Sequence, residues 1–295
     1  MDADQAKELT TVEANLEAGP GSNPSQEGNH LQADKGFSLV DQVKKAPRVV
    51  VSDDQYDFSW LEEAARCARR EGKRFSLIDS GLLPPEKIEW LAERGADIYS
   101  SDEAQRDFRQ LEFIGQSAKR GGSILAYFYR GTLTADAAEG ILGSLGNLGA
   151  QGTFLHLATR EKDELELIVN LGVECHRGGS WLVYYHRASL VEELVNLADT
   201  GTWLHLSSQQ IKTDEDTKFL LELVKICQLR GGNVVLYLEN ELPVIFLNDL
   251  IKHRAFVVFP SQLYDFRSPY RPLQDQSRRM RLDFRAYYLY PRLFS

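Results

Sequence analysis

Short runs of β-branched and aromatic residues alternate with longer amphipathic segments along residues 46–261. Most of these runs are apolar at both alternating positions, which is typical of parallel strands that are covered on both faces. Nine runs predict strands, at residues 48–52, 74–79, 96–101, 123–129, 153–159, 180–186, 202–207, 233–239 and 255–259. The segments between them predict helices, for example Phe58–Arg70, Asp163–Cys175 and Asp214–Leu229. This order of elements indicates an α/β protein with a parallel sheet.

The predicted strands are of two types that alternate along the chain. Strands of the first type follow a glycine pair and contain a tyrosine, at Gly121-Gly122, Gly178-Gly179 and Gly231-Gly232, with a weaker copy at Lys73. Strands of the second type follow a single glycine and contain a histidine, at Gly152 and Gly201, with relatives that begin at Gly95 and Arg254. The pattern indicates a βαβα unit of about 50 residues, present in about four copies.

The number of strands bears on how the sheet closes. Four copies of a two-strand unit supply eight strands, the number in a closed (β/α)8 barrel. We therefore expect a (β/α)8-like barrel built from βαβα repeats. A ninth strand candidate does not fit this closure, so either the first or the last strand lies outside it or the sheet is open. An open doubly wound parallel sheet is the alternative.

Charge divides the chain into three zones. The protein has 295 residues, and 43% of them are apolar, a fraction that is ordinary for a globular protein. Its net charge of −9 makes nucleic acid an unlikely partner. Residues 1–45 are acidic and hold a single aromatic residue, Phe37, so we expect a disordered acidic tail. Residues 46–261 form the expected barrel domain. Residues 262–295 combine seven arginines with eight aromatic residues, and we expect this basic segment to pack on the acidic barrel.

The ends of the chain and its cysteines bear on the compartment. The N-terminal residues lack a basic start followed by an apolar run, and no stretch is long and apolar enough to span a membrane. We therefore expect a cytoplasmic protein with no membrane association. The three cysteines, Cys67, Cys175 and Cys227, are far apart in the sequence, and we expect them to be buried, reduced thiols.

Ligands of parallel α/β folds bind at the carboxyl ends of the strands, and several polar residues fall there. Asp53, Asp79 and Asp102 follow three successive strands. Their carboxylates suit a divalent metal ion. Alternatively, they cap the N–H groups of the loops and helices that follow.

Other strand-end residues suggest anion binding or acid–base chemistry. Arg130 and Arg187 occupy equivalent positions of the unit beside expected helix starts, and Arg160 follows another strand, so the three are candidates for an anion site. Because His156 and His205 fall in the middle of strands, they indicate hydrogen-bonded core residues. His186, Asp79 and Glu239 are weak candidates for a catalytic acid or base.

The short connections after most strands favour a protein without catalysis, because enzymes of this class build their sites on long loops. We expect a degenerate barrel that acts as a binding, regulatory or assembly module, with other proteins or a second copy of itself as partners and a small anionic ligand as a further option. The alternative is a metal-dependent hydrolase or other enzyme acting on a small phosphorylated substrate. No cofactor is predicted apart from the divalent metal ion of the aspartate hypothesis.

Overall fold

A computed structural model describes residues 28–104, 107–131, 133, 135–158, 165–259 and 270–282. Nine strands form one all-parallel sheet in which each strand pairs with its neighbours along the chain. They are β1 (Arg48–Ser52), β2 (Arg74–Ile78), β3 (Ala96–Ser101), β4 (Leu125–Tyr129), β5 (Phe154–Ala158), β6 (Leu182–Tyr185), β7 (Trp203–Ser207), β8 (Asn233–Tyr237) and β9 (Phe256–Val258). The predicted parallel α/β fold is confirmed, and each predicted strand contains an observed one.

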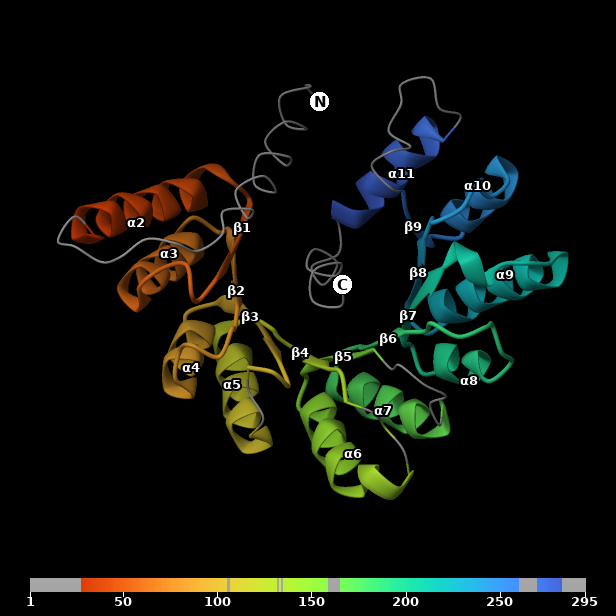
Figure 1. Cartoon of the computed structure of the whole chain (residues 1–295), viewed down its shortest axis with the longest axis horizontal. Helices are drawn as coiled ribbons and strands as arrows, with labels where there is room; N and C mark the ends of the chain where they lie inside the picture. The colour runs from red at the N-terminus through yellow and green to blue at the C-terminus, as the bar shows by residue number, and fades with distance from the viewer. Residues whose placement is uncertain are drawn as a thin grey trace.

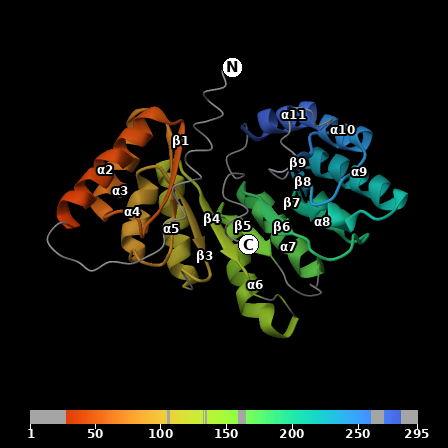
Figure 2. The same cartoon turned by 45° about the horizontal axis from the view of Figure 1, so that its top comes forward.

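Most helices connect successive strands and lie along the outer side of the sheet, which curves into an arc (Figures 1 and 2). They are α2 (Gly28–Lys45), α3 (Phe58–Arg70), α4 (Pro85–Glu93), α5 (Phe108–Gly121), α6 (Ala135–Ala150), α7 (Leu165–Gly178), α8 (Leu194–Asp199), α9 (Asp214–Leu229), α10 (Val244–Lys252) and α11 (Arg271–Leu282), with a short 3-10 helix at Ser208–Gln210. The winding and curvature are barrel-like. In the described part of the chain, however, β1 and β9 are the two edges of the sheet.

Each strand from β2 to β9 begins shortly after a residue with left-handed backbone geometry. Seven of these residues are glycines, and the eighth, Arg254, is the only non-glycine with positive φ in the described ranges, at 65°. After Gly179, for example, the N–H of Ser180 donates to the carbonyl of Cys175, which closes the helix end as a Schellman motif does. This turn explains why a glycine precedes almost every strand.

The left-handed residues also correct the alignment of the glycine pairs. The second glycine of Gly178-Gly179 has positive φ, whereas in Gly231-Gly232 it is the first. Counting from these residues, Tyr184 is equivalent to Leu236 and not to Tyr237. Because side chains alternate between the two faces of a strand, Tyr184 packs beneath the helices and Tyr237 faces the inner side.

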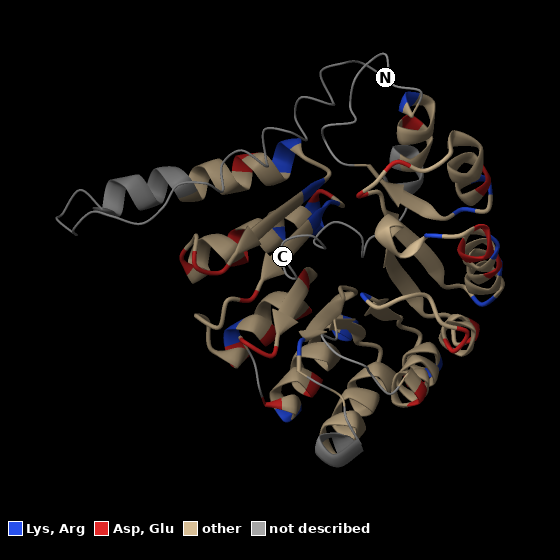
Figure 3. Cartoon of the chain, turned by 45° about the vertical axis from the view of Figure 1, so that its right-hand side comes forward, with Lys and Arg blue, Asp and Glu red and all other residues tan. Residues whose placement is uncertain are grey.

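The sheet carries apolar clusters on both faces. Beneath the helices, one buried cluster spans α2 to α5 with β1 to β4, and a second extends from α5 and β4 to α11. Two smaller clusters occupy the concave face, around Phe128 and around Trp203. Charged residues lie mainly on the helices and loops, and the strands carry few of them (Figure 3). Burial on both faces agrees with the apolar runs in the sequence.

The predicted tail over residues 1–45 differs from the structure in its second half. Residues 28–45 form α2, and Leu39 and Val43 are fully buried against the first core cluster. Gly36 lies so close to the Trp60 ring that an added Cβ would be 2.1 Å from it. Leu39 and Val43 are one helical turn apart and form an apolar stripe, which the average composition of the segment conceals. Residues 1–27 are outside the described ranges.

Part of the basic C-terminal segment packs on the end of the sheet. Tyr270 and Leu273 are buried within the larger core cluster. On α11, the Ser277 hydroxyl donates to the carbonyl of Val257 (2.6 Å) and accepts from the N–H of the same residue (3.2 Å). Ser277 thereby hydrogen-bonds the backbone N–H and carbonyl of Val257 on the outer edge of β9, where a further strand would otherwise bind. Residues 260–269 and 283–295 are outside the described ranges.

Several smaller expectations can also be compared with the structure. Cys67, Cys175 and Cys227 are buried free thiols, as predicted, and burial raises the pKa of both Cys175 and Cys227 to about 12. Among the described helices, none combines the length and apolar character that a bilayer span requires.

Candidate functional site

Asp53 and Asp79 lie just beyond β1 and β2, and their carboxylates hold the loop that follows β2. The two oxygens of Asp53 accept the N–H groups of Ser80 (2.9 Å) and Leu83 (3.1 Å). Asp79 accepts the N–H of Gly81 (2.9 Å) and the hydroxyl of Ser100 (2.6 Å). Both side chains are buried, at 1% and 4% exposure. This geometry matches the capping interpretation of these residues.

The electrostatics of Asp79 differ from those of an exposed carboxylate. Burial raises the pKa of Asp79 above its ordinary value, and the negative charge of Asp53 adds to this. The hydrogen bonds from Ser100 and Gly81 favour the charged form and oppose the shift. Asp79 is therefore a buried carboxyl at a strand end whose pKa is raised.

Asp102 lies past β3, and its Oδ2 accepts the N–H of Arg130 (3.1 Å). Within the described ranges, no group of three or more His, Cys, Asp or Glu side chains is arranged to hold a metal ion. The three aspartates thus each support a neighbouring loop, and the structure gives the metal hypothesis no assembled ligand set.

The candidate anion residues have different surroundings. The guanidinium of Arg130 forms an ion pair with Glu103 (3.0 Å), whose side chain is 67% exposed. Arg187 is exposed at the end of β6. Arg160 lies outside the described residues. Of the three candidates, the structure therefore shows Arg130 paired at the rim and Arg187 exposed beyond β6.

The catalytic candidates other than Asp79 also maintain loop structure. Nε2 of His186 lies 2.8 Å from the carbonyl oxygen of Ser189, so its N–H donates to that carbonyl. Burial lowers the pKa of His186. Glu239 accepts the hydroxyl of Ser207 (2.6 Å), and the buried Ser208 hydroxyl accepts the N–H groups of residues 239 and 240. These contacts fix the loops after β6, β7 and β8.

The concave face carries a row of rings, one from each strand between β3 and β8. Successive ring centroids lie 6.5, 4.2, 6.5, 4.7 and 5.7 Å apart. The rings belong to Tyr99, Phe128, His156, Tyr185, His205 and Tyr237. The rings on β3, β5 and β7 stand four residues after the left-handed glycine of their own helix–strand turn, and the rings on β4, β6 and β8 stand six residues after theirs. The two strand types thus supply alternate members of one continuous row.

Both histidines of this row are buried, as their mid-strand positions predict. His156 is fully buried and stacks on Phe128, and burial lowers its pKa to about 3. Nδ1 of His205 lies 3.0 Å from the hydroxyl oxygen of Tyr237. Burial, followed by the nearby His156, lowers the pKa of His205 well below its ordinary value. Both side chains are therefore neutral at pH 7.

A polar network that was not predicted lies at the start of β1 to β3. Arg48 donates to the hydroxyls of Tyr99 (2.8 Å) and Ser76 (3.3 Å). The neighbouring Arg74 forms an ion pair with Asp97 (3.2 Å), which is 1% exposed. Burial raises the pKa of Asp97, and the two arginines oppose that shift. Charged residues at inner-facing strand positions are the signal that predicts such a network.

Comparison with models of protein families finds no match to this chain, and a search of curated protein sequences finds none either.

Proposed function

We propose that this protein is a binding or assembly module in which the parallel sheet serves as a rigid scaffold. The observation that carries the proposal is the use of the strand-end polar groups. Asp53, Asp79, Asp102, His186 and Ser208 all bond to neighbouring backbone or hydroxyl groups of the same rim. Groups that maintain loops in this way stabilise the fold and are not available to bind a substrate without rearrangement.

The concave face supports the same proposal. In a repeat protein with an open sheet, the concave side is the usual binding surface. Here its central rings are packed against one another, and Phe128 and His156 are almost fully buried. Binding through the convex helices or the ends of the arc is therefore favoured. The partners we propose are other proteins or a second copy of the chain.

A second candidate function is an enzyme acting on a small phosphorylated substrate, with a divalent metal ion and an anion site that includes Arg130 and Arg187. The raised pKa of Asp79 is the observation that favours it, because perturbed carboxyls at strand ends are frequent in active sites. Under this alternative Asp79 acts as general acid or base. His186 is already bonded to Ser189 and would have to rotate to take part.

Replacing Asp53, Asp54 and Asp79 one at a time by asparagine separates the two functions. In the scaffold proposal, Asp53→Asn and Asp79→Asn each lower the free energy of unfolding by about 1–3 kcal/mol, because buried hydrogen bonds are lost. The adjacent Asp54 is exposed, so Asp54→Asn serves as the matched control and should leave stability unchanged. Urea denaturation measures these differences.

The same variants are tested for turnover of a phosphate monoester with Mg²⁺, Mn²⁺ or Zn²⁺ present. The scaffold proposal expects no turnover by the wild-type chain under any of these conditions. Wild-type turnover that Asp79→Asn abolishes, while stability and ligand binding survive, would establish the enzyme and refute the scaffold. Light scattering across a range of concentrations measures self-association in parallel.

A further inference from the structure

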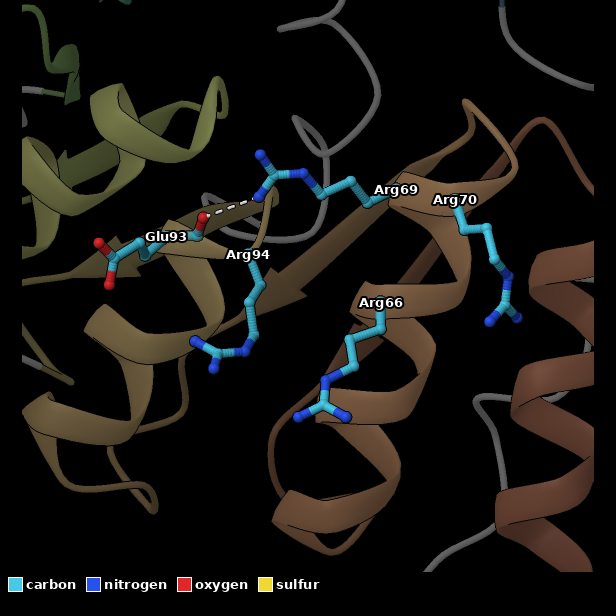
Figure 4. A pocket seen from close by; sticks show the side chains of 5 residues that line it. All are labelled: Arg66, Arg69, Arg70, Glu93 and Arg94. Atoms are coloured by element: carbon cyan, nitrogen blue, oxygen red, sulfur yellow. Dashed lines mark hydrogen bonds between the residues drawn. The ribbon is translucent and has the colours of Figure 1, made fainter.

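A shallow depression between α3 and α4 is lined chiefly by arginines and includes none of the strand-end residues described above. Its volume is about 550 Å³, and its lining residues are Arg66, Arg69, Arg70, Glu93 and Arg94. Arg66 and Arg94 extend into the space between the two helices, whereas Arg70 points away from it (Figure 4). Four guanidinium groups and one carboxylate on a single depression are unusual for a chain with a net charge of −9.

One glutamate fixes two of these arginines in place. Glu62 lies 2.5 Å from Arg66 and 3.5 Å from Arg94, and it accepts the indole N–H of Trp90 at 3.1 Å. The Trp90 hydrogen bond, together with the neighbouring arginines, lowers the pKa of Glu62, so this carboxylate is charged at neutral pH. The guanidinium carbon of Arg94 also lies 3.2 Å from the centre of the Trp90 ring. These groups are held in place before any ligand arrives, which lowers the entropy cost of binding.

The third arginine of the depression has no carboxylate within ion-pair distance in the described structure. Arg69 is exposed, and its Nη1 donates to the backbone carbonyl of Glu93 at 3.2 Å. The carboxylate of Glu93 pairs instead with Arg120. Arg70 pairs with Glu71, so this pair adds no net charge. Arg66, Arg69 and Arg94 are thus accompanied by one paired carboxylate, that of Glu62, which leaves an excess of two positive charges among these four side chains.

Basic residues in the last turn of a helix also stabilise the negative end of its dipole. This effect accounts for Arg69 and Arg70, which end α3. It does not account for Arg66, which lies a turn earlier, or for the shared binding of Arg66 and Arg94 by Glu62. Guanidinium groups from both α3 and α4 are therefore presented on one depression.

We propose that this depression binds the phosphate group of a small phosphorylated ligand. A phosphate monoester carries a charge of about −1.5 to −2 at pH 7, which matches the excess of two positive charges. The planar guanidinium forks of Arg66 and Arg69 suit its oxygens, since each can donate two parallel hydrogen bonds. The depression is open, so the organic part of the ligand extends into solvent. The site is independent of the proposed scaffold function, because it uses no strand-end residue.

Calorimetric titration with phenyl phosphate and with inorganic phosphate tests the proposal. We expect saturable binding to the wild-type chain, and Arg66→Ala and Arg69→Ala should each weaken it about 10- to 100-fold, the loss typical of a hydrogen bond to a charged group. Arg69→Lys keeps the charge but loses the fork, so it should weaken binding less than Arg69→Ala. Tighter binding of phenyl phosphate than of phosphate indicates an ester ligand, and equal binding indicates that the phosphate group alone is recognised.

A matched control separates a defined site from general surface charge. Arg177, in the last turn of α7, is 69% exposed and pairs with Glu174 on the same helix. Arg177→Ala should leave phosphate binding unchanged, and melting temperatures should show that all variants fold. The proposal is overturned by absence of binding to the folded wild-type chain or by an equal loss in Arg177→Ala. It is also overturned if a duplex DNA oligonucleotide binds through the arginines while both phosphate ligands do not.

Discussion

Two adjacent glycines at the end of α7 should respond to the same substitution for different physical reasons. At Gly178 an added Cβ would lie 2.1 Å from the carbonyl oxygen of Gly149 and 2.7 Å from that of Ala150. At Gly179 the Cβ would meet nothing within 4 Å, but the backbone has a φ of +75°. The first position is limited by the close approach of α6 and α7, and the second by backbone conformation.

The structure gives the sign and size of each effect. In a helix interior, alanine is favoured over glycine by about 1 kcal/mol, so without the contact Gly178→Ala would stabilise the protein. The clash with backbone atoms reverses this sign, and we expect a loss of about 2–3 kcal/mol, near the upper end of overpacking costs. Gly179→Ala should lose about 1 kcal/mol, because left-handed geometry costs about 1–2 kcal/mol and the stiffer unfolded chain offsets part of it.

Gly143 provides the matched control, because it lies within α6, is exposed and has no atom within 4 Å of its Cβ position. Gly143→Ala should therefore stabilise the protein by about 0.5–1 kcal/mol. Urea denaturation followed by circular dichroism measures all three variants. If Gly178→Ala were as stable as the wild type, the close packing of α6 against α7 would be refuted.

Three further predictions concern other parts of the fold. Arg254→Gly should raise stability by about 0.5–1 kcal/mol in urea denaturation, because it relieves left-handed strain at an open turn, and a loss would contradict the geometry of that turn. His156 has a pKa of about 3 in the folded protein and an ordinary value of 6.5. Its contribution to the free energy of unfolding is therefore complete above pH 6.5 and is lost as the pH falls from 6.5 towards 3. The slope is about 1.4 kcal/mol per pH unit, and His156→Phe should reduce the acid dependence of unfolding by that amount. Ser277→Ala should destabilise the protein by about 1–3 kcal/mol and accelerate hydrogen exchange at the Val257 amide, and unchanged exchange would show that the hydroxyl does not close the sheet edge.

The sequence predicted the strands well because their signal is local. The strands from β2 to β8 are apolar runs that each follow a helix-ending glycine, and both features depend on a few adjacent residues. The same local reasoning misaligned Tyr237, because a glycine pair does not show which member adopts positive φ. It also missed the packing of α2, since the two residues that anchor it, Leu39 and Val43, are diluted by polar neighbours.

The candidate site was less predictable because its meaning depends on which face of the sheet each residue occupies. Alternate residues of a strand lie on the same face. Asp53 therefore continues the face of Val49 and Val51, and Asp79 continues the face of Phe75 and Leu77. Both carboxylates therefore follow helix-facing positions and meet the loop backbone. This alternation is visible in the sequence and favours capping. The arginine depression was not predictable, because it joins residues from two helices whose relative position only the fold defines.

The order of the strands has a consequence for how the molecule opens. Because each of the nine described strands pairs only with its chain neighbours, this part of the protein is a linear array of layers, and its stability is close to a sum over adjacent layers. Within the described ranges, the two large core clusters share two elements, α5 and β4. Fraying can start at either end of the arc and stop at that seam, so each half can lose structure while the other half persists. A partner that clasps one end would protect that half alone, and a pulling force applied to the two ends would remove the layers in sequence.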